Sequence, residues 1–187
     1  MSTLDPYTLP PDLPVPQDDG AAAHLVGMEI PALVLPSSAG PVDLREWAAA
    51  KLVLYVYPRA GRPGREMPAG WDAIPGARGC TPQSCGFRDH NSELAELGAR
   101  VLGVSAQPLA DQVEFAERNR MPFPIVSDEG LELGAALRLP VFDVEGMTLY
   151  RRLALVATGG RIEHVFYPVF PPDRNAADVV AYLRTAA

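Results

Sequence analysis

The chain contains two cysteines, Cys80 and Cys85, and they are five positions apart. They lie in a segment that we expect to open a helix, and the strand-like run of residues 52–57 precedes that segment along the chain. A helix N-terminus carries partial positive charge and unpaired backbone N–H groups, which favour a thiolate there. A second thiol on the same helix is a natural partner for the first once it is oxidised. The pair therefore predicts thiol redox chemistry.

Two other interpretations of the cysteines are open at this point. Cys80, Cys85 and His90 could be ligands of a metal ion, but a fourth ligand is missing and the spacing is not the usual Cys-x2–4-Cys. Alternatively, Cys80 is a half-buried thiol without chemistry. We expect no metal site, and we favour thiol redox chemistry over an inert thiol.

Composition indicates one domain and excludes several classes of partner. The 187 residues carry a net charge of −7, and Lys and Arg are scattered without interleaved aromatic residues, so we expect no nucleic-acid or anionic-membrane surface. No apolar run approaches the ~20 residues of a membrane span. Residues 1–20 lack the basic and apolar regions of a secretory signal, which predicts a cytoplasmic protein. In that compartment two cysteines indicate catalysis before a structural disulfide.

Proline is over-represented, at 20 of 187 residues against about 5% in ordinary proteins. One group of prolines predicts an extended N-terminal arm, residues 1–26, ahead of a domain formed by residues 27–187. A second group, mixed with glycines, marks a long loop that ends just before Cys80 and contains an apparent insertion at about residues 62–79. Loops of this length are usually functional or disordered.

The remaining pattern alternates strands and helices. The expected elements are a hairpin at 30–35 and 41–44, helices at 44–50, 83–97, 109–120, 131–137 and 178–183, strands at 52–57, 100–104 and 125–128, and a hairpin at 152–157 and 161–167. Asn175 or Asp173 would cap the last helix. Such alternation, followed by a hairpin and a helix, predicts an α/β sandwich with a mixed central sheet.

This order, with a cysteine at the first long helix, resembles the thioredoxin-like fold of the peroxiredoxins, in particular the peroxiredoxin Q or bacterioferritin comigratory protein subgroup. The subgroup motif reads Tyr-Pro-x-x-x-Thr-Pro-Gly-Cys-Thr-x-x-x-Cys-x-x-Arg-Asp. Tyr57 and Pro58 begin that run here, and residues 80–89, Cys-Thr-Pro-Gln-Ser-Cys-Gly-Phe-Arg-Asp, complete it. Further similarity lies at 101–105, 124–128 and 160–166. The resemblance implies a mixed central sheet flanked by helices, with an N-terminal β-hairpin extension.

One part of the motif is absent. The family uses a threonine hydroxyl, in Pro-x-x-x-Thr-x-x-Cys, to position peroxide and thiolate. Counting back from the first cysteine finds Ala77 and Ala73 in the Thr and Pro places, and counting forward from the Tyr-Pro pair finds Arg62 in the Thr place. We expect Thr81 to be a helix N-cap, with Pro82 at the first helical position. The inserted loop is expected to supply backbone N–H donors in place of the hydroxyl.

The resemblance implies a thiol-dependent peroxidase that reduces hydrogen peroxide and organic hydroperoxides. Cys80 would be the peroxidatic cysteine, which becomes a sulfenic acid, and Cys85 the resolving cysteine of an intramolecular disulfide. Five residues of helix rise about 7.5 Å, so that bond requires local unwinding. Alternatively, Cys85 is a small core residue and an external thiol resolves Cys80.

The resemblance also implies an arginine near the sulfur, on the strand before the last hairpin turn. Arg152 matches if the turn is one residue shorter here, and Arg151 matches if it is not; we favour Arg152. Adjacent strand residues face opposite sides, so only one can reach Cys80.

The implied partners are a peroxide substrate and a thioredoxin-like reductant, with no cofactor and no metal, and the protein would be a monomer or homodimer. The alternative function is a thioredoxin-fold disulfide exchanger or redox sensor without peroxidase activity, because the threonine of the motif is missing.

Overall fold

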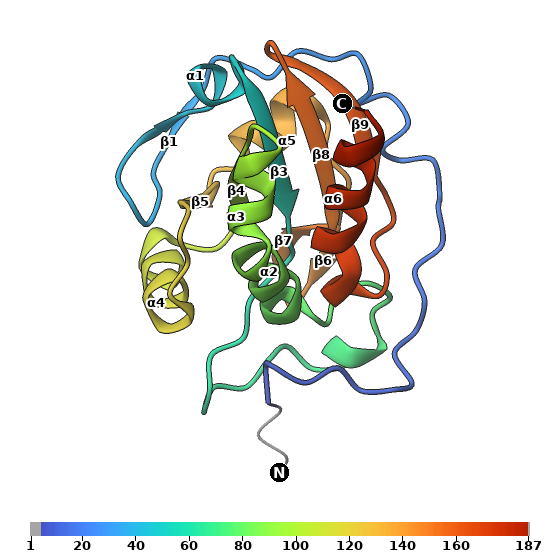
Figure 1. Ribbon diagram of the computed structural model, residues 1–187. Coiled ribbons are helices and arrows are strands. Elements are labelled where there is room, and N and C mark those ends of the chain that lie inside the picture. Colours follow the sequence, from blue (N-terminus) through green and yellow to red (C-terminus); the bar gives the residue numbers. More distant parts are fainter. Residues whose placement is uncertain (1–4, 187) are drawn as a thin grey trace.

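A five-stranded mixed sheet lies at the centre of the computed structural model, which describes residues 5–186 (Figure 1). Its strand order is β5-β4-β3-β8-β9. The strands are β3 (Lys51–Val56), β4 (Ala99–Ser105), β5 (Ile125–Ser127), β8 (Leu153–Thr158) and β9 (Arg161–Phe166). β3, β4 and β5 are parallel, and β8 and β9 are antiparallel to their neighbours. The predicted α/β fold with a mixed sheet is confirmed.

Helices cover both faces of this sheet. They are α1 (Leu44–Ala48), α2 (Cys80–Asp89), α3 (Asn91–Glu96), α4 (Leu109–Asn119), α5 (Glu132–Leu137) and α6 (Asn175–Thr185), with short 3-10 turns at Trp71–Ala73 and Pro172–Arg174. Side chains of α2, α3, α4 and α6 share one core cluster, and those of α1 and α5 share the other. Figure 1 shows α2, α3 and α6 side by side in front of the sheet.

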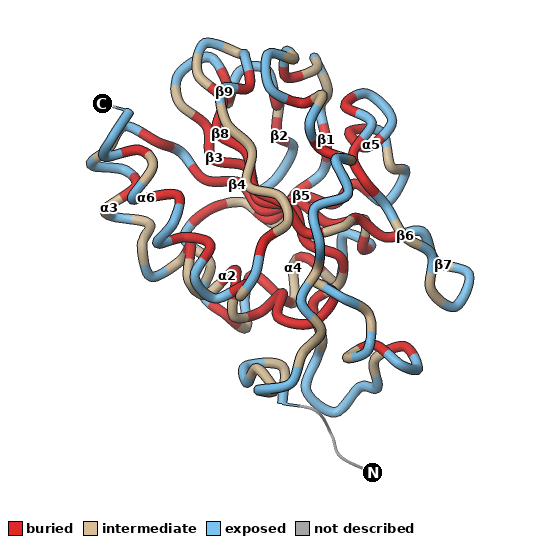
Figure 2. Tube along the Cα trace, turned by 90° about the vertical axis from the view of Figure 1, so that its right-hand side faces the viewer, coloured by how far each residue is buried: buried red, intermediate tan, exposed pale blue. Residues whose placement is uncertain are grey.

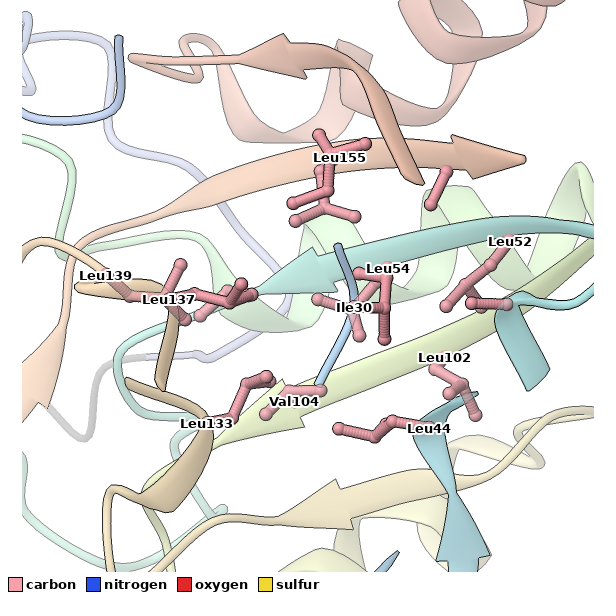
Figure 3. Packing of buried hydrophobic residues seen from close by; sticks show 14 of the residues in the cluster. Ile30, Leu44, Leu52, Leu54, Leu102, Val104, Leu133, Leu137, Leu139 and Leu155 are labelled. Carbon is pink, nitrogen blue, oxygen red and sulfur yellow. The ribbon is translucent and has the colours of Figure 1, made fainter. Parts of the chain in front are cut away.

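The strand run 52–57 explains why two cores form. Leu52 and Leu54 pack into the cluster under α1 and α5 (Figure 3), whereas Val53 and Tyr55 pack under α2 and α6. All four side chains are fully buried. Successive strand residues point to opposite faces, so a continuous apolar run is the pattern of a strand covered on both sides.

Two small hairpins lie outside the main sheet. The predicted N-terminal hairpin is present as β1 (Val34–Leu35) and β2 (Val42–Asp43). A second hairpin, β6 (Val141–Val144) and β7 (Met147–Tyr150), was not predicted. Its turn is Glu145-Gly146, and both residues have positive φ, 47° and 76°. A two-residue turn of that kind is usually marked in the sequence by Asn-Gly or Asp-Gly, whereas this turn has Glu-Gly.

Three expectations about helix ends were wrong. The helix predicted at 83–97 begins at Cys80 and breaks at His90, which separates α2 from α3. Gly79, with φ 104°, is the N-cap of α2, so Thr81 lies inside the first turn. Asn175 is the first residue of α6, where its side chain accepts a hydrogen bond from Gln83 instead of capping the helix. Asp173 likewise provides no cap.

The described part of the N-terminal arm, residues 5–26, lies against the domain; residues 1–4 of the predicted arm are outside the described residues. Figure 1 shows it in blue, running along the side of the molecule past β9, and Figure 2 shows that most of it is exposed. The C-terminal end of the arm is the part that joins the hydrophobic core, through Ala22 and Leu25. None of the helices within residues 5–186 has the length and apolar character needed to cross a membrane.

Candidate active site

The topology brings Cys80 and Arg152 to the same edge of the sheet. β3 and β8 are antiparallel, and Val56, the last residue of β3, pairs with Leu153, the first residue of β8. Arg152 directly precedes β8, so it lies where the chain leaves β3. The loop after β3 returns to this edge and begins α2 at Cys80. Residues 72 positions apart in sequence thus become neighbours.

Arg152 is buried, with 3% of its surface exposed, and its guanidinium contacts the sulfur. Nη2 donates to Sγ of Cys80 at 3.2 Å, and Nη1 donates to Oε1 of Gln83 at 2.6 Å. The other acceptors are carbonyls of the loop. Nε donates to the carbonyl of Gly76 at 3.2 Å, and Nη2 also donates to those of Ala77 at 2.9 Å and Arg78 at 3.1 Å. Gln83 is itself held by Asn175, to which its Nε2 donates at 2.9 Å. These contacts fix the guanidinium in one orientation.

No carboxylate lies within 4 Å of Arg152 among residues 5–186. A buried charge without an opposite charge is costly. A negative charge on Sγ of Cys80 would balance it, and Cys80 is also the first residue of a ten-residue helix, whose N–H groups favour an anion. The site therefore suits an anionic sulfur.

Arg151 points elsewhere. Its guanidinium lies over the ring of Phe142, 5.7 Å from the ring centroid. Both arginines line a cavity of about 310 Å³ beside the arm. Of the two adjacent arginines, Arg152 is the one in contact with Cys80.

The inserted loop holds the arginine and also lines the depression at Cys80. Trp71 is buried in a small cluster with Ala77 and Leu149, so the unpredicted β6–β7 hairpin anchors the loop. The carbonyls of residues 76–78 accept hydrogen bonds from Arg152, and the Cys80 thiol donates toward the Ala77 carbonyl at 3.6 Å. That loop N–H groups take the place of the threonine hydroxyl stays a prediction.

Thr81 is a residue that sequence reasoning assigned wrongly. Its hydroxyl is buried and has no hydrogen-bond partner among the described residues. Thr81 lines the same small depression as Cys80. A buried hydroxyl without a partner is unfavourable, so a ligand in this depression is the natural group for it to bond. The sequence feature that could have indicated a role for Thr81 in the site is its position next to Cys80.

Cys85 lies on the same intact helix as Cys80, and both are free thiols. Its thiol faces α4, where it is 3.9 Å from Oδ1 of Asn119. Burial raises the pKa of the Cys85 thiol, and the nearby Arg88 charge acts in the opposite direction. The ring of Phe87, two residues later, stacks on Tyr55 at 4.4 Å between centroids, which fixes the middle of the helix to the sheet. The two sulfurs can meet only if the first turns of α2 unwind.

The structure gives no sign of a metal site among residues 5–186: no group of three or more His, Cys, Asp and Glu side chains lies together there. His90 bonds to Glu93 at the start of α3 instead.

Comparison with known proteins agrees with this geometry. Residues 25–183 match the protein family described as Redoxin. Chloroplastic peroxiredoxin Q of Gentiana triflora is 26% identical over 145 residues, which are 78% of this chain and 59% of that protein. The chain likewise spans 59% of the length of two peroxiredoxin Q relatives from rice. A relative from Coxiella burnetii, named as a peroxiredoxin of the bcp type, is 28% identical over 163 residues, 84% of this chain and 97% of its own length.

Solved structures show the same fold. The peroxidoxin BcpB of Mycobacterium tuberculosis superposes with a TM-score of 0.70 at 27% identity, over 87% of this chain and 97% of the other. A peroxiredoxin Q variant from Xanthomonas campestris superposes with a TM-score of 0.65 at 24% identity, over 94% and 99%.

Proposed function

Because the chain belongs to the Redoxin family, we propose that it is a thiol-dependent peroxidase that reduces hydrogen peroxide and organic hydroperoxides. The names of its relatives, peroxiredoxin Q and peroxidoxin BcpB, support this activity. The observation that carries the proposal is the buried contact of 3.2 Å between Arg152 Nη2 and Cys80 Sγ. A disulfide exchanger without peroxidase activity does not require such a fixed, otherwise unbalanced charge at its sulfur.

In the first step, the Cys80 thiolate attacks the terminal oxygen of a hydroperoxide. An S–O bond forms while the O–O bond breaks, which leaves a sulfenic acid on Cys80 and an alkoxide that takes up a proton to become alcohol or water. Negative charge moves from sulfur to the leaving oxygen. The Arg152 guanidinium, already oriented by Gln83 and the loop carbonyls, stabilises that charge without reorganisation.

In the second step, the first turns of α2 unwind and the Cys85 thiolate attacks the sulfenic sulfur. A Cys80–Cys85 disulfide forms and hydroxide leaves, which becomes water on protonation. Pro82 in the first turn and Gly86 next to Cys85 make this part of the helix easier to open. A dithiol of the thioredoxin type then reduces the disulfide by thiol exchange.

Rapid mixing of the reduced protein with stoichiometric hydrogen peroxide tests the proposal. Trp71 lines the depression at Cys80, so its fluorescence can follow the reaction. We expect one peroxide consumed and two thiols lost in wild type, no reaction in Cys80→Ser, and one complete first turnover in Cys85→Ser. Slow peroxide consumption that is equal in wild type and Cys80→Ser would leave the exchanger or sensor as the better function.

We further propose that residues 1–26 form an arm on a domain of residues 27–187, which is supported by a family match that begins at residue 25. A cytoplasmic location is supported by the bacterial relative, although the plant relatives are chloroplastic. Whether the protein is a monomer or a homodimer stays a prediction for measurement in solution.

A further inference from the structure

The depression that contains Cys80 has a strongly basic lining. Four arginines line it, Arg59, Arg62, Arg65 and Arg78, and no aspartate or glutamate of residues 5–186 does. The protein as a whole carries a net charge of −7, so this concentration of positive charge is local. A basic concavity in an acidic protein raises the local concentration of anions and excludes cations.

Two of these arginines are occupied by the protein itself. Arg78 is buried, lies 3.4 Å from an Asp72 carboxylate oxygen, and donates to the arm carbonyls of Asp5 and Thr8. Arg62 lies 3.6 Å from Glu114 across the neighbouring surface. The partners of Arg78 and Arg62 lie outside the lining of the depression. Both arginines are therefore engaged in contacts within the protein.

Arg59 and Arg65 have no such partner. Within residues 5–186, no carboxylate oxygen lies within 4 Å of either guanidinium. The nearest side-chain partner of Arg59 is the Met147 sulfur, at 3.8 Å. Arg59 is half-buried and Arg65 is exposed, and both residues line the depression.

The lining of the depression also has an apolar part. Pro6 of the arm, Met67 and the buried Trp71 complete the wall beside Cys80. Hydrogen peroxide would use neither the arginines nor this surface. A molecule with an apolar body and a carboxylate would use both, because guanidinium presents a fork of N–H donors that matches a carboxylate.

We propose, on the basis of the peroxidase function above, that Arg59 and Arg65 select organic hydroperoxides that carry a carboxylate. The carboxylate binds the two free guanidinium groups, the apolar body packs on Met67 and Trp71, and the hydroperoxide group extends to Cys80. Arg59 and Arg65 determine specificity and take no part in breaking the O–O bond.

The test compares two substrates that differ only in charge: cumene hydroperoxide with a para-carboxylate and the methyl ester of that compound. We expect kcat/KM to be about tenfold higher for the acid in wild type and the two values to converge in an Arg59→Gln/Arg65→Gln variant, since each ion pair contributes a few-fold. Arg45→Gln removes an exposed charge from α1, at the opposite end of the sheet in Figure 1, and is the matched control that should keep the preference. Added salt should weaken the preference of wild type.

Equal kcat/KM values for acid and ester in wild type would overturn the inference, and so would a preference that survives in the double variant. A binding measurement separates this outcome from failure of the peroxidase proposal. Cys80→Ser protein is titrated with the alcohol product of the para-carboxylate probe, which cannot react. Binding that the double substitution weakens about tenfold supports the subsite even if peroxidase activity is absent, and no binding overturns it.

Discussion

Replacing Arg152 with methionine should slow attack on peroxide by about 10²–10³, because it removes a preorganised donor at the reacting sulfur. Methionine keeps much of the side-chain volume but none of the N–H groups. The lost contact is the bond from Nη2 to Cys80 Sγ at 3.2 Å. In free energy the expected rise of the barrier is about 2.7–4 kcal/mol.

The same substitution also destabilises the fold, so the assay must separate the two effects. Four oxygen acceptors, the Gln83 side chain and three loop carbonyls, lose their donor. We expect a loss of about 2–4 kcal/mol in the free energy of unfolding, since buried unpaired acceptors cost about 1–3 kcal/mol each and water can reach some of them. Urea denaturation measures this loss, and stopped-flow mixing at a temperature where the variant is folded measures the rate.

Two further variants make the result decisive. Arg152→Lys keeps the charge without the fork and should recover part of the rate. Arg151→Met removes the adjacent arginine, which lies over Phe142, and should react within about threefold of wild type. A fully folded Arg152→Met protein that reacts as fast as wild type, or a slow Arg151→Met protein, would refute the assignment.

The remaining predictions concern the helix, its thiols and the loop. Peroxide should produce an intramolecular Cys80–Cys85 disulfide with partial loss of helical circular dichroism; peptide mapping that finds only intermolecular disulfides would contradict this. Resolution should accelerate as pH rises from about 6 toward 9, because the Cys85 thiolate is the attacking group and helix opening removes the burial that raises its pKa, returning it toward about 8.5; a flat pH profile of disulfide formation would show that ionisation of Cys85 does not limit resolution. Thr81→Val should leave the free energy of unfolding unchanged or higher, since the hydroxyl has no partner, yet slow peroxide attack about tenfold; an unchanged rate constant would remove the hydroxyl from the mechanism. Shortening the loop at 62–79 to a Thr-Pro-Gly link should slow the reaction because Arg152 loses its carbonyl partners, and a rate equal to wild type would show that the loop is not needed.

The sheet was predictable because its signal is local. The apolar run of residues 52–57 and the similar run that follows Arg100 are typical of strands covered on both faces, and the order of elements then indicates the fold. The two cysteines were predictable as a pair for the same reason, since helix position and spacing are both visible in the sequence.

The parts of the site that were not predictable depend on contacts between distant residues. The N-cap position 79 requires glycine, because its φ is 104° and a Cβ there would lie 2.2 Å from Cγ of Pro172, a clash that no local pattern reveals. The carbonyls that hold Arg152 come from a loop without regular structure, anchored by a hairpin whose turn has an unusual sequence. The choice between Arg151 and Arg152 likewise required the register of β8 with β3.

Gln83 connects the sulfur chemistry to the C-terminal helix. It is fully buried in the first turn of α2 after Cys80, and its amide joins Arg152 on one side to Asn175 on the other. When the start of α2 unwinds to form the disulfide, Gln83 must leave both partners, and α6 loses a tether at its first residue. The surface around the start of α6 therefore differs between the dithiol and disulfide forms. By thermodynamic reciprocity, a reductant that binds this exposed surface more tightly than the closed one also favours the open helix. Such a reductant would bind the disulfide form of the protein in preference to the dithiol form.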